Sequence, residues 1–154
     1  MLGHEALAEA LVAEGTEVVF GLIAGGVERL ASVLHAKHKV RFIKVRHEEV
    51  AIGMADGYSR ATGKIGVALV GPGPGLSNAG AAMQGARMAK SRMLVIVGAP
   101  APDGDRHGPM LIDQPPFLKA TIGAIQDLRA PGTMSEDVAL AFRHIRLGRG
   151  PIAL

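Results

Sequence analysis

The sequence has 154 residues, a length that suits one globular domain with a hydrophobic core. Hydrophobic residues make up 48% and charged residues 20%, which excludes a disordered chain, and the absence of cysteine excludes disulfides and thiolate chemistry and is compatible with a cytoplasmic protein. The net charge is +3, but aromatic residues amount to only 3%, which argues against nucleic-acid binding, and no apolar run is long enough to span a membrane.

Helical and strand patterns alternate along the chain. Helices are predicted over residues 3–14, 27–36, 47–63, 76–90 and 135–146, the last with Ser135 as its N-cap. Strands are predicted over residues 17–21, 40–45, 65–70, 93–98 and 152–154, with 93–98 central, and residues 99–108 read as a polar loop. Residues 110–130 are ambiguous, with a short helix expected near 116–120 and a strand near Ile125.

This alternation predicts an α/β fold, a doubly wound, mostly parallel sheet with helices on both faces. No internal repeat and no linker divides the sequence. We therefore expect a single domain over residues 1–154.

Glu48 stands in the first turn of the predicted helix 47–63. At about 100° per residue it shares a small, apolar face with Ala51, Ile52, Ala55 and Ser59. Glu49 lies instead on the polar face, with Asp56 and Arg60. A carboxylate that begins a buried face needs a partner. Two interpretations remain open: an acid favoured by the helix dipole, or a functional carboxylate. His47, just before it, is expected to be structural.

A loop of glycine and proline, residues 71–75, joins the strand 65–70 to the next helix. One interpretation is a phosphate-binding turn. However, Pro72 and Pro74 lack the N–H groups that a phosphate cradle uses, and the strand 93–98 ends without an acidic residue for a ribose. A dinucleotide site is therefore disfavoured.

This part of the chain strongly resembles the pyrimidine-binding (PYR) domain of thiamine diphosphate enzymes of the acetolactate synthase and benzaldehyde lyase type. The matching positions are Arg46-His47-Glu48, Ala51, residues 54–64, Gly66-Val67, Gly73-Pro74-Gly75 and Asn78. The resemblance extends more weakly over nearly the whole chain and includes Gly150-Pro151-Ile152 near its end.

The resemblance implies that thiamine diphosphate is the cofactor and that Glu48 is catalytic, because the matching glutamate hydrogen-bonds N1′ of the aminopyrimidine and so promotes loss of the C2 proton. It also implies that Pro74 and Gly75 let the backbone approach the ring and that Asn78 lies near the cofactor. For Asn78, a structural role as a polar residue at a helix start stays open.

Two segments depart from the family pattern. Residues 22–25 (LIAG) stand where Pro-Gly is usual, which puts contacts from that turn in doubt. Met110 stands where a glutamine commonly lines the active site, although the following Asp113-Gln114 pair is retained. The substrate chemistry is therefore left open.

The diphosphate half of the family pattern is missing. That half holds Mg²⁺ through Gly-Asp-Gly followed by Asn-Asn, but Asn78 is the one asparagine here and Gly104-Asp105 is followed by Arg106. The acids Asp103 and Asp105 are read as a solvated turn. We therefore expect no metal site in this chain and a partner domain or subunit that binds Mg²⁺ and the diphosphate.

The resemblance thus implies an enzyme that works only with this partner: a decarboxylase, carboligase or lyase acting on a small 2-oxo acid or acyl compound. It also implies a homodimer or larger assembly, because such active sites form between subunits, and the small residues of 76–90 would permit close contact. A non-catalytic PYR-like module with a structural or regulatory role remains the alternative.

Overall fold

The computed structural model describes residues 2–99, 110 and 112–154. Its helices are α1 (Gly3–Ala13), α2 (Glu28–Ala36), α3 (Glu48–Thr62), α4 (Pro74–Asn78), α5 (Gly80–Met88), α6 (Gln114–Thr121), the 3₁₀ helix η1 (Pro131–Thr133) and α7 (Met134–Arg146). Its strands are β1 (Val18–Gly21), β2 (Arg41–Lys44), β3 (Gly66–Val70), β4 (Met93–Val97), β5 (Ala124–Ile125) and β6 (Ile152–Ala153). Apart from Ala99, the predicted loop 99–108 lies outside the described residues, as do Asp103 and Asp105.

The six strands form one sheet in the order β2-β1-β3-β4-β6-β5. Every neighbouring pair is parallel, so the sheet is entirely rather than mostly parallel. β4 lies inside the sheet, as its continuous hydrophobic run predicts. The expected short strand near Ile125 is β5, and the expected helix near residues 116–120 is the longer α6.

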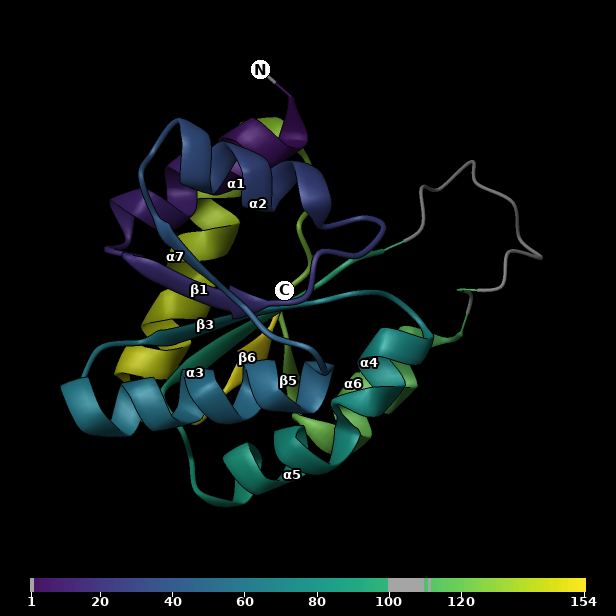
Figure 1. Ribbon diagram of the computed structural model, residues 1–154. Helices are drawn as coiled ribbons and strands as arrows, with labels where there is room; N and C mark the ends of the chain where they lie inside the picture. Colours follow the sequence, from purple (N-terminus) through teal and green to yellow (C-terminus); the bar gives the residue numbers. More distant parts are fainter. Residues whose placement is uncertain (1, 100–109, 111) are drawn as a thin grey trace.

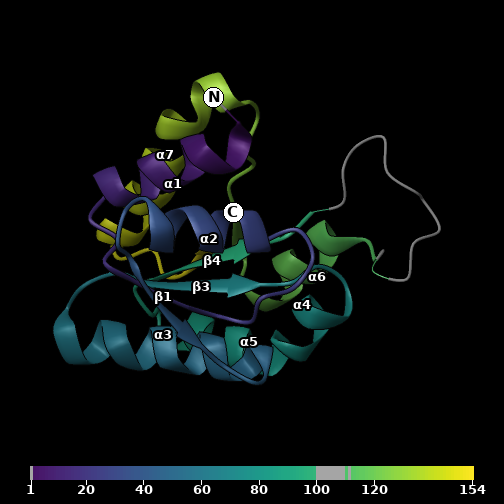
Figure 2. The same ribbon diagram turned by 45° about the horizontal axis from the view of Figure 1, so that its top comes forward.

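Helices cover both faces of the sheet, which confirms the doubly wound α/β prediction. α1, α2 and α7 lie on one face, and α3 and α5 lie on the other (Figures 1 and 2). Side chains alternate between the two layers along each strand. On β3, Val67 and Leu69 belong to the first hydrophobic cluster, and Ala68 and Val70 belong to the second, which also includes Leu76 of α4 and Leu118 of α6.

α3 packs directly onto β3. A side chain at Gly66 would overlap the backbone of Ala55, so only glycine allows this approach. Ala51 and Ala55 are completely buried at the same contact. This close packing fixes the position of α3, and with it the position of Glu48.

The order in which successive strands join the sheet reverses at β1. From β1 it runs through α2 to β2 on one side, and then through α3 to β3 on the other side of β1. In open parallel sheets, ligands bind at the carboxyl ends of the strands beside such a reversal. Here that edge carries the beginning of α3 and the loop 71–75.

The prediction of a single helix over residues 76–90 is wrong. α4 begins at Pro74 and ends at Asn78, and α5 begins at Gly80. The amide of Ala79, between them, bonds the carbonyl of Leu76 only three residues back, at 3.1 Å. Proline suits the first position of α4 because the N–H that it lacks would have no partner within the helix. Asn78 therefore ends a helix instead of beginning one.

The prediction of Ser135 as the N-cap of the last helix is also wrong. η1 leads directly into α7, and Thr133 takes the N-cap position. The Thr133 hydroxyl donates to Oδ2 of the fully buried Asp137 at 3.0 Å, and Nη2 of Arg129 donates to Oδ1 at 2.6 Å. This network, which local sequence spacing does not reveal, sets the start of α7.

Candidate cofactor site

Glu48 is held at the first position of α3. His47 precedes it in an extended conformation, and its Nδ1 accepts the backbone N–H of Glu49 at 3.3 Å, which is an N-cap contact. Glu48 is only 8% exposed, whereas Glu49 is exposed. The predicted buried face of α3 is confirmed, since it consists of Glu48, Ala51, Ile52, Ala55 and Ser59.

The Glu48 carboxylate meets α4. Nδ2 of Asn78 donates to Oε2 of Glu48 at 3.1 Å. A Cβ atom on Gly75 would lie 3.0 Å from Oε1 of the same carboxylate. The structure therefore brings Glu48, Gly75 and Asn78 together. Asn78 ends α4, directly before the N-cap residue of α5, and its amide contacts Glu48.

Pro74 is the exposed first residue of α4, directly before Gly75. Gly73 precedes it with φ 59°, a positive value that favours glycine and lets the chain turn into the helix. The backbone of Met110 lies against Gly73, and a Cβ on Gly73 would overlap it. Pro74 thus shares α4 with the residues that contact Glu48, and it reaches the site only through its neighbour Gly75.

Sequence reasoning missed the contacts of Gln114. Its Oε1 accepts the N–H of Gly73 at 3.0 Å, and its Nε2 donates to the carbonyl oxygen of Gly98 at 3.1 Å. Gln114 therefore ties the loop ahead of α4 to the end of β4. The retained Asp113-Gln114 pair was the available signal, but spacing does not show which backbone groups a side chain reaches.

Two backbone amides of the segment 71–75 are used internally. Gly73 donates to Gln114, Gly75 donates to the carbonyl of Pro72 at 3.3 Å, and Pro72 and Pro74 have no N–H. A phosphate would need these donors pointing at it. The geometry therefore agrees with the sequence in disfavouring a dinucleotide site.

Across residues 2–99, 110 and 112–154, no three or more histidine, aspartate or glutamate side chains are grouped to hold a metal ion. No helix there combines the length and the hydropathy needed to cross a bilayer.

Residues 1–117 match the family model described as thiamine pyrophosphate enzyme, N-terminal TPP binding domain. The chain belongs to this family. This TPP-binding domain is 46% identical over 77 residues to the acetolactate synthase large subunit of Haemophilus influenzae, an alignment that covers 50% of the chain and 13% of the relative. It is 40% identical over 99 residues to 2-hydroxyacyl-CoA lyase 2 of Danio rerio, covering 64% of the chain and 16% of the relative.

A third relative spans almost the whole domain. The acetolactate synthase large subunit of Parasynechococcus marenigrum is 32% identical over 160 residues, which cover 99% of the chain and 25% of that relative. The TPP-binding domain therefore corresponds to a quarter or less of the length of these three relatives. The resemblance inferred from residues 46–78 is thus confirmed at the level of the family.

The residues present fit the pyrimidine end of thiamine diphosphate. Glu48 offers a largely shielded carboxylate, and among the described residues only Asn78 donates to it, at Oε2. Beside Oε1, Gly75 leaves the space that a Cβ would fill. Oε1 accepts no hydrogen bond among the described residues, so it is the carboxylate oxygen available to a ring nitrogen.

Proposed function

We propose that Glu48 is the catalytic carboxylate of a thiamine diphosphate-dependent enzyme that acts on a small 2-oxo acid or acyl compound. The observation that supports this proposal is the joint placement of Glu48, Gly75 and Asn78 at the carboxyl edge of the sheet. A solvated surface glutamate would need neither the shielding nor the amide partner.

The roles proposed for the three residues combine what the family resemblance implies with their contacts. Glu48 shares a proton with N1′ of the pyrimidine through Oε1, because Oε2 is occupied by Asn78. Asn78 orients the carboxylate, and Gly75, together with Pro74, lets the backbone approach the ring. When bound, thiamine diphosphate supplies the nucleophilic carbon that attacks the carbonyl of the substrate. A shielded carboxylate is suited to this task because its hydrogen bond strengthens away from water.

We further propose that Mg²⁺ and the diphosphate are held by a partner domain or subunit. Magnesium prefers oxygen ligands and usually bridges carboxylates and phosphates. The described residues offer no group of ligands for it, and the amides of Gly73 and Gly75 already bond within the chain. The relatives are also several times longer than this domain.

The same proposal includes at least a dimer. On α5, Ala81, Gly85 and Met88 are exposed, and Met88 is 86% exposed. A Cβ on Gly85 would meet nothing within 4 Å, so a second helix can approach here. Light scattering should show a dimer or larger species at high micromolar concentration, and a strict monomer would count against this part.

A chimera tests the catalytic proposal. This domain replaces the aligned segment of the Parasynechococcus marenigrum relative, and turnover and C2–H exchange of bound cofactor are measured. Glu48→Gln should slow both by orders of magnitude, because it removes the acid–base group, and the neighbouring Glu49→Gln should change them little. Equal losses in the two variants would reject Glu48 as the catalytic carboxylate.

The alternative, a non-catalytic PYR-like module, makes a different prediction for the same chimera. It would assemble normally and show no cofactor-dependent turnover even with Glu48 intact. The hydrogen bond between Asn78 and Glu48 within this chain favours the catalytic proposal.

A further inference from the structure

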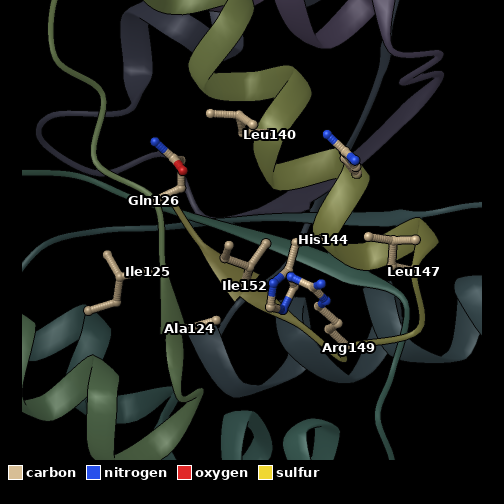
Figure 3. Close-up of a pocket in the computed structure, with 9 residues that line it drawn as sticks. Ala124, Ile125, Gln126, Leu140, His144, Leu147, Arg149 and Ile152 are labelled. Atoms are coloured by element: carbon tan, nitrogen blue, oxygen red, sulfur yellow. The ribbon is translucent and has the colours of Figure 1, made fainter.

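A cavity of about 500 Å³ lies away from the candidate cofactor site, between α7 and the β5–β6 edge of the sheet (Figure 3). No residue of α3, α4 or the loop 71–75 lines it. Its apolar side chains are Ile125, Leu140, Leu147 and Ile152, and its polar ones are Gln126, Arg143, His144 and Arg149. The polar lining thus carries two guanidinium groups and an imidazole but no carboxylate.

The arginines of this segment do not share one role. Arg146 is used within the fold, since its Nη1 bonds Oε2 of Glu14 at 2.6 Å and its guanidinium lies over the ring of Phe142. Neither Arg143 nor Arg149 forms an ion pair with any carboxylate in the described part of the chain. Cations in the last turn of a helix are ordinarily explained by the helix dipole. That explanation does not cover Arg149, which follows Gly148 beyond the end of α7.

His144 adds a polar ring to the lining of the cavity. Its Nε2 is buried and has no hydrogen-bond partner among the described residues, which is unusual for a buried polar atom. Because this nitrogen has almost no accessible surface, the ring lines the cavity through its other atoms. Burial, and then the positive charge of Arg149, lower the pKa of His144 below its ordinary value. Figure 3 shows the His144 ring and the Arg149 side chain converging over Ile152.

We propose that this cavity binds a small organic anion, a carboxylate or phosphate joined to an apolar group. Arg143 and Arg149 donate hydrogen bonds to the charged group, the His144 ring lies beside it, and the apolar remainder lies against Leu140, Leu147 and Ile152. The volume falls within the range of small-molecule sites, about 300–1,000 Å³. Arginine suits both anions because its planar fork matches carboxylate and phosphate oxygens.

Nuclear magnetic resonance titration of the isotope-labelled chain tests the proposal with four probes: isovalerate, phenyl phosphate, inorganic phosphate and the neutral isovaleramide. Isovalerate or phenyl phosphate should bind saturably, shift the ring signals of His144, and bind at least about tenfold more tightly than isovaleramide. Inorganic phosphate should bind more weakly than the better organic anion because it lacks the apolar group. The tighter of the two organic anions identifies the charged group that the site prefers.

A matched pair of double variants separates the site from general attraction between charges. Arg143→Gln combined with Arg149→Gln should weaken binding at least about tenfold. Arg29→Gln combined with Arg41→Gln removes the same charge from exposed positions elsewhere and should leave binding unchanged. If the first pair unfolds the chain, Arg149→Gln alone serves, because Arg149 lies outside the helix. No saturable binding, equal binding of isovaleramide, or equal weakening by the control pair would each overturn the proposal.

Discussion

Asn78 and Glu48 are 30 residues apart in the sequence, yet Nδ2 of Asn78 donates to Oε2 of Glu48 at 3.1 Å. The contact joins the last residue of α4 to the first residue of α3. It leaves the other carboxylate oxygen facing Gly75. The two helices therefore meet through a hydrogen bond and a glycine, and a substitution at that glycine should affect the carboxylate without disturbing the core.

Gly75→Ala should impair the site while leaving the fold intact. The added methyl group would lie 3.0 Å from Oε1 of Glu48, so the carboxylate must shift by a few tenths of an ångström. In the chimera we expect weaker cofactor binding and slower C2–H exchange, with a change in unfolding free energy within about 1 kcal/mol. The control is Gly57→Ala on the exposed face of α3, where a Cβ meets nothing among the described residues, and which should stabilise the domain by roughly 0.5–1 kcal/mol. Unchanged cofactor binding in Gly75→Ala would contradict the placement of the ring.

Gln114→Ala should loosen the loop ahead of α4. The substitution removes two hydrogen bonds, one accepted from the N–H of Gly73 and one donated to the carbonyl oxygen of Gly98, each contributing roughly 0.5–1.5 kcal/mol. Hydrogen exchange should show faster exchange of the Gly73 amide, and denaturant unfolding should show a loss of about 1–3 kcal/mol. Gln84→Ala, at an exposed position of α5, should change neither. An unchanged Gly73 amide would mean that Gln114 does not hold the loop.

Asp137 should make the stability of the domain depend on pH. Hydrogen bonds from Arg129 lower the pKa of Asp137 below its ordinary value of 3.8, against the opposing effect of burial. A lowered pKa in the folded state stabilises the fold above the ordinary value, and this contribution is lost as the pH falls through the folded pKa. Asp137→Asn should therefore lower the melting temperature at pH 7, and its difference from the original protein should shrink in acid.

The control for this experiment is Asp127→Asn, at an exposed position nearby. It should leave the melting temperature nearly unchanged at every pH, because an exposed carboxylate has a similar environment in the folded and unfolded chain. A difference between Asp137→Asn and the original protein that stays constant down to strong acid would show that the charge of Asp137 is not what stabilises α7.

The sequence predicted the part of the site that depends on helix periodicity. The side-chain period of α3 separates Glu48 from Glu49, because burial on the sheet follows every third or fourth residue. The break between α4 and α5 escaped prediction because residues 76–90, rich in alanine and glycine, carry no proline to mark it. The break becomes visible only in the structure, where Asn78, the last residue of α4, turns its amide to Glu48.

Long-range side-chain contacts were the other limit. Gln114 reaches Gly73 across 41 residues, and the buried Asp137 gathers Arg129 and Thr133 around the start of α7. Neither contact follows from local spacing, because each depends on how separate elements pack. The parallel sheet and its two helical layers were predictable because they depend only on the alternation of strand and helix patterns.

The last prediction concerns the isolated chain, which should bind thiamine diphosphate weakly or not at all. Its described residues provide a carboxylate, an amide and a glycine at the pyrimidine end, and no group of metal ligands for the diphosphate end. A hydrogen bond to a charged group contributes roughly 1.5–3 kcal/mol. Association costs about 4–15 kcal/mol in lost freedom of motion, so this contact alone does not suffice.

Calorimetry with the purified chain, thiamine diphosphate and Mg²⁺ measures this directly. We expect no saturable binding up to about millimolar cofactor, and the same result for Glu48→Gln, because the missing anchor rather than the carboxylate limits affinity. The chimera, which supplies the diphosphate-binding remainder of a relative, should bind the cofactor in a Mg²⁺-dependent manner. Tight, Mg²⁺-dependent binding by the isolated chain would show that it carries its own diphosphate anchor, and the proposal of a separate partner for that half of the cofactor would fail.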